Sequence, residues 1–251
     1  MAFRPRLIPT LFTIPSLIIL VILGGWQLQR LNWKEDLIDK LQTRSVETPA
    51  ALPVGELDQE AWEYRRVRVT GIFNHDQEQH LLNRSLNGNP GIHVMTPLVR
   101  TDATGAGQTI LVNRGWIPFD RKARDTRPEG LLKGEVTVQG ILRFPREVTG
   151  LQRVFLPENE PQRNMWYNAE MSQIESTIDA PLPNYYLVDG RTETPGLYPV
   201  GKQWRLDIRN DHLQYALTWF FMALTLAVIY VIYHRPKKEG AEDEGAGGTR
   251  S

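Results

Sequence analysis

The chain contains 251 residues, and its 29 basic and 29 acidic side chains give a formal net charge of zero at pH 7. This balance, without a basic patch, gives no support to a nucleic-acid-binding role. The absence of cysteine excludes disulfide bonds, cysteine-ligated zinc, iron–sulfur clusters and haem attached through cysteine.

The first apolar run covers residues 7–28 and contains no charged side chain. A helix needs about 20 such residues to cross a bilayer, because each residue rises about 1.5 Å through a core of about 30 Å. Arg4 and Arg6 would also suit a signal peptide, but no small-x-small cleavage site follows and the run is long for one. We therefore predict a membrane span over 7–28 after a short N-terminal segment, 1–6.

Helical periodicity continues beyond this span. Apolar residues recur at roughly 3.6-residue spacing from Leu28 to Leu41, with charged residues between them. Thr48-Pro49 then interrupts the pattern. We predict one continuous helix to about Arg44, with residues 29–46 as an extension outside the membrane.

The middle of the chain, residues 47–209, has the pattern of short strands separated by turns. Such spacing is typical of an antiparallel barrel or sandwich, and a single domain accounts for it. Strands are predicted at 63–73, 79–83, 92–100, 109–116, 136–144, 165–167 and 185–188, and a short helix at about 169–177.

A second apolar run predicts a membrane span over 210–233. Basic residues follow it between 235 and 238, as they precede the first span, and Lys and Arg favour the cytoplasmic ends of spans. We therefore predict that the N-terminus and residues 234–251 are cytoplasmic, with a disordered acidic tail, and that the middle domain is periplasmic in a bacterial inner membrane.

These patterns predict a membrane α+β protein in which two antiparallel transmembrane helices flank an antiparallel β-rich domain, barrel- or sandwich-like, outside the cytoplasm. No catalytic signature is present, so we expect no enzymatic activity. His75 and His80 flank an acidic stretch, but five residues apart on a strand or turn they would not face one metal ion. A polar hairpin is the favoured interpretation.

The most informative residue is His212, on the first turn of the second span after Asn210 and Asp211, which are good N-caps. His212, Ala216, Trp219, Ala223 and Ala227 fall on one stripe of that helix. Small residues in such a stripe allow another backbone, or a flat molecule, to come close.

The first span carries a matching cluster at the same membrane depth. Gly24 and Gly25 precede Trp26, and Arg30 and Trp33 continue the face of Trp26. We expect the two spans to approach each other at Gly25, so that leucine at this position would disturb their packing. With His212, these residues suit a haem: imidazole for iron and arginine for propionates. The alternative is an interfacial aromatic belt with a polar residue at a helix end.

Three segments carry a resemblance to a known family. They are Gly25-Trp26-Gln27-Leu28-Gln29-Arg30-Leu31-Asn32-Trp33-Lys34, Val112-Asn113-Arg114-Gly115-Trp116-Ile117-Pro118 and Asn210-Asp211-His212-Leu213-Gln214-Tyr215-Ala216-Leu217-Thr218-Trp219-Phe220. In this order, and with the two-span layout, they resemble the surfeit-locus (Surf/Shy-type) family of cytochrome c oxidase assembly proteins.

The resemblance implies an assembly factor that helps haem a reach the catalytic subunit of the oxidase. Its expected partners are cytochrome c oxidase subunit I, the haem a synthase and the lipid bilayer, and its expected cofactor is transient haem a. The resemblance implies His212 as the haem iron ligand, with Trp26, Arg30 and Trp219 as weaker haem-binding candidates.

The second motif supplies the interaction candidates Asn113, Arg114, Gly115 and Trp116. Gly115 suits a positive φ or a close backbone approach, and Arg114 suits a surface contact. Two alternatives to a haem carrier stay open at this point. One is a scaffold that binds no haem and docks the synthase and the oxidase subunits, and the other, disfavoured by the missing catalytic residues, is a membrane-tethered enzyme. A quinol oxidase also stays open as the client.

Overall fold

The structure is a computed structural model that describes residues 6–145, 150, 154–204 and 210–235. The predicted tail, Arg4 and the basic residues Lys237 and Lys238 lie outside these residues. The chain divides into two compact units, a helical unit of residues 1–37 and 208–251 and a β-rich unit, Ile38–Asp207.

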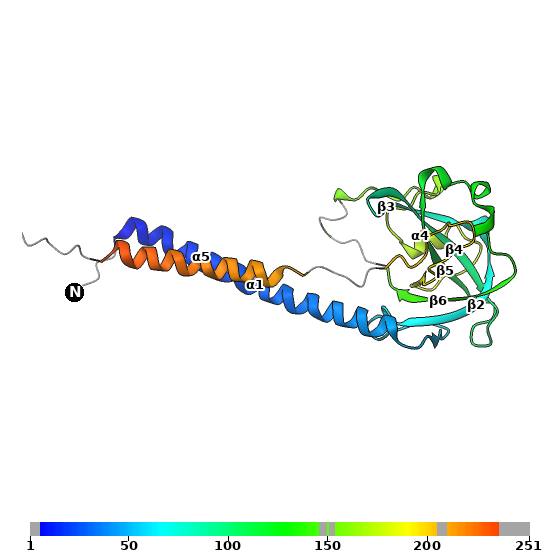
Figure 1. Cartoon of the computed structure of the whole chain (residues 1–251), viewed down its shortest axis with the longest axis horizontal. Coiled ribbons are helices and arrows are strands. Elements are labelled where there is room, and N and C mark those ends of the chain that lie inside the picture. The colour runs from blue at the N-terminus through cyan, green and yellow to red at the C-terminus, as the bar shows by residue number, and fades with distance from the viewer. Residues whose placement is uncertain (1–5, 146–149, 151–153, 205–209, 236–251) are drawn as a thin grey trace, which may run out of the picture. The chain divides into compact units, whose positions relative to one another are not determined.

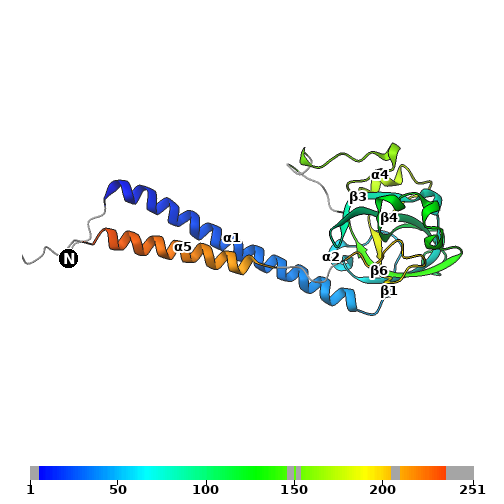
Figure 2. The ribbon, with the colours of Figure 1, turned by 45° about the horizontal axis from the view of Figure 1, so that its top comes forward.

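The helical unit pairs α1 (Leu7–Val46) with α5 (His212–Tyr233). The two helices lie side by side in both views (Figures 1 and 2). The hydroxyls of Thr10 and Tyr230 are 2.6 Å apart, so the start of α1 meets the end of α5. The helices are therefore antiparallel, as predicted, and both are long and apolar enough to cross a membrane.

The close approach of the two helices depends on Gly24. A Cβ atom at Gly24 would lie 2.7 Å from the ring of Phe220, whereas one at Gly25 would meet nothing within 4 Å. Consecutive helical residues point about 100° apart, so only one of two adjacent glycines can face the partner. The expectation that leucine at Gly25 would disturb the packing is wrong, because Gly24 and not Gly25 faces the second helix.

Among its described residues, the β-rich unit has seven strands and includes two short α-helices. The strands are β1 (Ala50–Ala51), β2 (Arg66–Phe73), β3 (Gln79–Leu86), β4 (Asn89–Arg100), β5 (Thr109–Pro118), β6 (Glu135–Arg143) and β7 (Tyr186–Asp189), and the helices are α2 (Gln59–Trp62) and α4 (Met171–Glu175). One-turn 3₁₀ helices are η1 (His75–Gln77), η2 (Phe119–Arg121), η3 (Arg124–Thr126), η4 (Pro128–Gly130) and η5 (Pro161–Arg163).

The strands close into a barrel. The sheet runs β1-β2-β6-β7-β5-β4-β3, and an additional pairing of β2 with β4 closes the ring β2-β6-β7-β5-β4. Of the two predicted architectures, barrel or sandwich, the structure has the barrel. Most pairings are antiparallel, but β1 with β2 and β5 with β7 are parallel. Within the ring each strand pairs on both sides, which removes the edges of an open sheet, whereas β1 and β3 lie outside the ring.

Most predicted strands are present with small shifts at their ends, and one is not. Residues 165–167 form isolated bridges, of Trp166 with Leu81 and of Met165 with Glu160, in place of a strand. Trp166 is fully buried against β3 and belongs to a core cluster with Met171 and Ile174. Its strand-like sequence therefore reflects burial of a large side chain rather than a ladder of hydrogen bonds.

The barrel interior is mainly apolar, and Arg100 is one of three buried arginines among the described residues. The main cluster comprises Leu52, Val67, Val69, Phe73, Leu98, Ile110, Val112, Val138, Leu142, Phe144, Tyr185 and Leu187. At the rim, Arg100 is 1% exposed and donates to the Leu52 carbonyl and to Asp102 and Gln108, each at 2.7 Å. The hydrogen bonds from Arg100 lower the pKa of Asp102. Arg100 thereby ties the residues that follow α1 to the barrel.

Replacing Gly24 with leucine should separate the outer parts of α1 and α5, because overpacking a tight contact costs about 1–3 kcal/mol. Gly25→Leu is the matched control, since its side chain would enter open space. The chain has no native cysteine, so cysteines introduced at Gln27 and His212, whose side chains are in contact, allow bis-maleimide bridging to report pairing of the outer parts in nanodiscs. Equal loss of bridging in both leucine variants would contradict this packing.

Candidate functional site

His212 is the first residue of α5 and is half-buried. Its backbone N–H lies 3.5 Å from the side-chain oxygen of Asn210, so the residues before the helix contribute to its cap. Its ring Nδ1 lies 2.7 Å from Oε1 of Gln27 on α1, 185 positions earlier in the chain. The outer ends of the two apolar helices are therefore joined by a polar contact that involves the candidate iron ligand.

This contact sets the hydrogen positions on the imidazole. An amide oxygen only accepts hydrogen bonds, so Nδ1 of His212 carries the hydrogen and Nε2 of the neutral ring has the free lone pair. Among the described residues, Nε2 has no hydrogen-bond partner. A ring of this kind, with one nitrogen donating to the protein and the other free, is the usual arrangement of a metal-binding histidine.

Trp26 and Arg30 form a separate cluster. The guanidinium carbon of Arg30 lies 5.8 Å from the ring centre of Trp26 and 5.2 Å from that of Trp33. Trp26 is two residues from Gly24 and so points about 160° away from the residue that packs on α5. The described contacts of Trp26 and Arg30 are thus with each other and with Trp33, and not with His212.

The small residues of the α5 stripe serve helix packing. Ala216 and Ala223 are the buried residues of this helix, at 0% and 7% exposure. Trp219, on the same stripe, is half-buried. The stripe therefore has the first of its two predicted roles, the close approach of another backbone. Because Ala216 and Ala223 are buried, no space for a flat molecule is left beside them.

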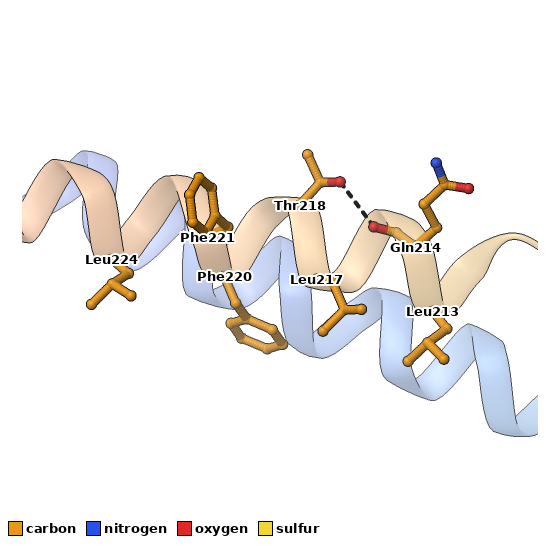
Figure 3. A pocket seen from close by; sticks show the side chains of 7 residues that line it. All are labelled: Leu213, Gln214, Leu217, Thr218, Phe220, Phe221 and Leu224. Atoms are coloured by element: carbon orange, nitrogen blue, oxygen red, sulfur yellow. Dashed lines mark hydrogen bonds between the residues drawn. The ribbon is translucent and has the colours of Figure 1, made fainter.

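An open groove of about 750 Å³ follows another face of α5 (Figure 3). Its lining is Leu213, Gln214, Leu217, Thr218, Phe220, Phe221 and Leu224. The Thr218 hydroxyl donates to the Gln214 carbonyl at 2.9 Å, so it is satisfied within the helix. The groove contains no ionisable side chain and suits acyl chains or an apolar partner helix rather than a ligand for iron.

The four residues of the Asn113–Trp116 motif lie at a β-bulge in β5. Val94 pairs with Gly115 and Met95 with Asn113, so Arg114 is an extra residue without a partner on β4. Its side chain is buried at 2% exposure and packs over the ring of Phe73 at 4.9 Å. The expectation that Arg114 makes a surface contact is wrong, because the bulge turns its side chain inward.

The buried guanidinium of Arg114 donates hydrogen bonds to a carbonyl and to an imidazole. It donates to the carbonyl of Gly130 and to Nδ1 of His75, the latter at 3.4 Å. Burial, together with the positive charge of Arg191, lowers the pKa of Arg114 to about 10, so the side chain still carries its charge at neutral pH. Arg114 therefore acts as an internal cross-link of the barrel.

Gly115 and Trp116 attach the chain segment that precedes α5. Gly115 has φ +126°, and a Cβ atom there would lie 2.0 Å from the carbonyl oxygen of Val200. Trp116 and Val200 exchange backbone hydrogen bonds of 2.9 and 2.8 Å. Both roles expected for Gly115, a positive φ and a close backbone approach, are confirmed.

Asn113 completes the bulge from the other side. Its side-chain oxygen accepts from the backbone N–H of Gly115 at 3.1 Å, and its amide nitrogen lies 3.1 Å from Nδ1 of His93. Asn113, Arg114, Gly115 and Trp116 are all buried. None of them offers a side-chain surface to a partner, so their contribution to any interaction is to hold the barrel in shape.

His75 and His80 belong to different hydrogen-bond networks. Nε2 of His75 donates to the Leu132 carbonyl at 2.9 Å, whereas Nε2 of His80 lies 2.9 Å from Glu78, which also pairs with the buried Arg127. No group of three or more His, Asp or Glu side chains in the described part of the chain is placed to hold a metal ion.

Sequence reasoning missed Gln27 and the buried ion pair of Glu78 with Arg127. Gln27 lies within the first motif, but the sequence pattern assigns it no role. A polar amide next to an apolar run, at the depth of a histidine on the other span, was the available signal. The sequence contained no comparable signal for the pairing of Glu78 with Arg127, because the two residues are 49 positions apart.

Comparisons with known proteins agree with the resemblance. The SURF1 family model matches residues 15–224, which include all three motifs. The chain is 34% identical to Surfeit locus protein 1 of Mus musculus over 222 residues, 83% of this chain and 70% of the mouse protein. It is also 33% identical to a SURF1-like protein of Rickettsia felis over 222 residues, 86% of this chain and 92% of that protein.

Gly115→Ala should destabilise the barrel by more than about 3 kcal/mol, because the new methyl group meets the Val200 carbonyl and φ is unfavourable. Gly107→Ala is the control, since Gly107 also has a positive φ, +87°, but open space around it. Urea unfolding of the full chain in nanodiscs, followed by tryptophan fluorescence, measures both. Equal losses would show that backbone conformation alone, and not the approach of Val200, requires glycine.

The barrel should lose stability as the pH falls from about 6.5 towards 3. Burial, and to a lesser degree the charge of Arg84, lowers the pKa of His93 to about 3, so the unfolded chain takes up this proton first. The contribution of His93 to the free energy of unfolding is fully present above pH 6.5. As the pH falls below 6.5, this contribution decreases by up to about 1.4 kcal/mol per pH unit for one such group. His93→Gln should flatten this dependence in urea unfolding. An unchanged pH profile in that variant would contradict the assignment.

Proposed function

The chain belongs to the SURF1 family, and from that premise we propose that it is an assembly factor for cytochrome c oxidase. In this proposal it receives haem a and presents it to the catalytic subunit, with His212 as the iron ligand. The observation that carries the proposal is the half-buried imidazole of His212, whose Nδ1 is bonded to Gln27 while Nε2 is free for a metal.

The residues around His212 fit a haem at the end of the helix pair rather than between the helices. Ala216 and Gly24 are used for packing, so a macrocycle has no room there. His212 lies at the end of α5, where apolar helix surface meets polar chain. A porphyrin with an apolar ring and charged propionates has the same division of polarity. Bound haem would supply the iron that Nε2 ligates.

The remaining haem-binding candidates have unequal support. Trp219 lies on the same stripe as His212 and is half-buried. Arg30 has the charge to pair with a propionate, but its described contacts are with Trp26 and Trp33. We propose that Trp219 contacts the haem bound at His212. We propose that Arg30 and Trp26 contact a lipid headgroup, or the haem during its transfer.

The proposed role is binding and transfer without covalent chemistry. A single histidine holds a haem less tightly than two axial ligands, which suits a carrier that must release its cargo to subunit I. The haem a synthase is the proposed donor. The chain holds its cargo by ligation and by contacts with the macrocycle, so we propose no enzymatic step.

The proposed location is a bacterial inner membrane with both termini in the cytoplasm. Arg6 precedes α1 and Arg235 follows α5, so these two basic residues lie at the same end of the antiparallel pair, opposite to the end with His212. Lys and Arg at span ends favour the cytoplasmic side. The barrel is then periplasmic. The bacterial relative in Rickettsia felis is consistent with this setting.

A second candidate function is a scaffold that binds no haem. The groove on α5 offers an apolar surface to a transmembrane partner, and the Gln27–His212 hydrogen bond also serves as a tie between helices. In this alternative the synthase and the oxidase subunits dock on the protein, and His212 has only a packing role.

His212→Ala should abolish most haem a binding while the protein remains inserted and folded, because the iron loses its protein ligand. The measurement is the optical spectrum of the full chain, purified in mild detergent from cells that make haem a. His234→Gln, at the other end of the same helix, is the histidine control and should keep the wild-type spectrum. Wild-type haem content in His212→Ala would refute the ligand, and a colourless wild type would favour the scaffold.

A further inference from the structure

We propose that Gln27 is the positioning residue of the haem site: its side-chain oxygen holds His212 in the Nδ1–H tautomer and directs Nε2 outward for ligation. This inference rests on the proposed function for its haem-dependent part. Its structural part, the tautomer of His212, exists without haem and is testable by itself.

The geometry of the contact supports a strong, directional hydrogen bond. The 2.7 Å separation is at the short end of the range for N–H···O bonds. Both side chains are half-buried, so the bond is partly shielded from water and is electrostatically stronger than in solution. In a free imidazole the hydrogen would exchange between the two nitrogens. Beside Gln27 it is retained on Nδ1.

Gln27 lies on α1 and His212 on α5, so the hydrogen bond between them forms only when the two helices are paired. Gln27 lies less than one turn from Gly24, whose contact with Phe220 allows the two helices to come close. The reach of the amide to His212 is therefore set by the same packing. Separation of the helices would release the ring, which offers a way to couple a partner's arrival to release of the haem.

The chemical character of the acceptor also matters. A hydrogen bond from Nδ1–H raises the basicity of the ligating nitrogen, and a carboxylate acceptor does so more than a neutral amide. Gln27 is neutral, so it orients the imidazole without giving it the strong donor character that a carboxylate would. A moderate iron–histidine bond suits a protein that must pass its haem on.

The first test uses the haem-free full chain in nanodiscs. Nitrogen NMR of ¹⁵N-histidine-labelled protein distinguishes the two tautomers of His212, assigned by comparison with His212→Ala. The wild type should show the Nδ1–H form, and Gln27→Met, which keeps the length but removes the acceptor, should show a mixture. Gln29→Met, at an exposed position on the same helix, is the control. An unchanged tautomer in Gln27→Met would overturn the inference.

The second test uses the haem-loaded protein. Gln27→Met should weaken haem a binding by about tenfold or more, as loss of a partner of a metal-binding histidine does. Resonance Raman of the reduced protein should show a lower iron–histidine stretching frequency in Gln27→Met and a higher one in Gln27→Glu, with a lower midpoint potential in the latter. Gln29→Met should match the wild type.

The outcomes separate this inference from the proposed function. If haem is present in the wild type and lost in His212→Ala, but Gln27→Met and Gln27→Glu have wild-type frequencies, Gln27 only ties the helices and the inference fails alone. If the wild type binds no haem, or His212→Ala retains it, the proposed function fails and the haem-dependent part falls with it. The tautomer measurement then still decides whether Gln27 sets the state of His212.

Discussion

The bulge at Arg114 is the constraint on which much of the barrel depends. One extra residue in β5 turns the Arg114 side chain into the interior and gives Gly115 a positive φ. The backbone of Val200 can then approach within hydrogen-bonding distance of Trp116. A Cβ atom at Gly115 would occupy the position of that carbonyl, so closure on this side requires glycine. The motif therefore fixes the chain segment that leads towards α5.

The barrel satisfies its buried charges with its own groups. Arg100 and Arg114 donate to backbone carbonyls as well as to side chains, and Arg127 pairs with Glu78. Breaking one of these contacts would leave a buried charge without compensation, so the arginines restrain the segments that they join. The described barrel thus has the character of a structural domain. In the proposed function the barrel binds partner proteins, while the haem is ligated by His212.

The helical unit combines packing and proposed ligand binding in a few residues. Gly24 allows α1 and α5 to come close, and Gln27 on α1 then reaches His212 on α5. A histidine held by another helix is neither a simple cap nor a free surface residue. Its accessible nitrogen and its dependence on helix packing are the properties that a temporary haem ligand needs. The same packing explains why small residues near the site do not form a cavity.

The sequence by itself determined the two long apolar helices and most strands, because these depend on local pattern: about 20 consecutive apolar residues for a helix that can cross a membrane and short alternating runs for a strand. It also predicted the requirement for glycine at position 115, whereas haem ligation by His212 stays a prediction. Only the tertiary structure decided the parallel pairing of β5 with β7, the burial of Arg114, the place of Trp166 outside any strand, and the choice of Gly24 over Gly25. It alone joined Gln27 to His212, which lie 185 residues apart. These features depend on which distant segments meet and on the rotation of each helix about its axis, and local pattern contains neither.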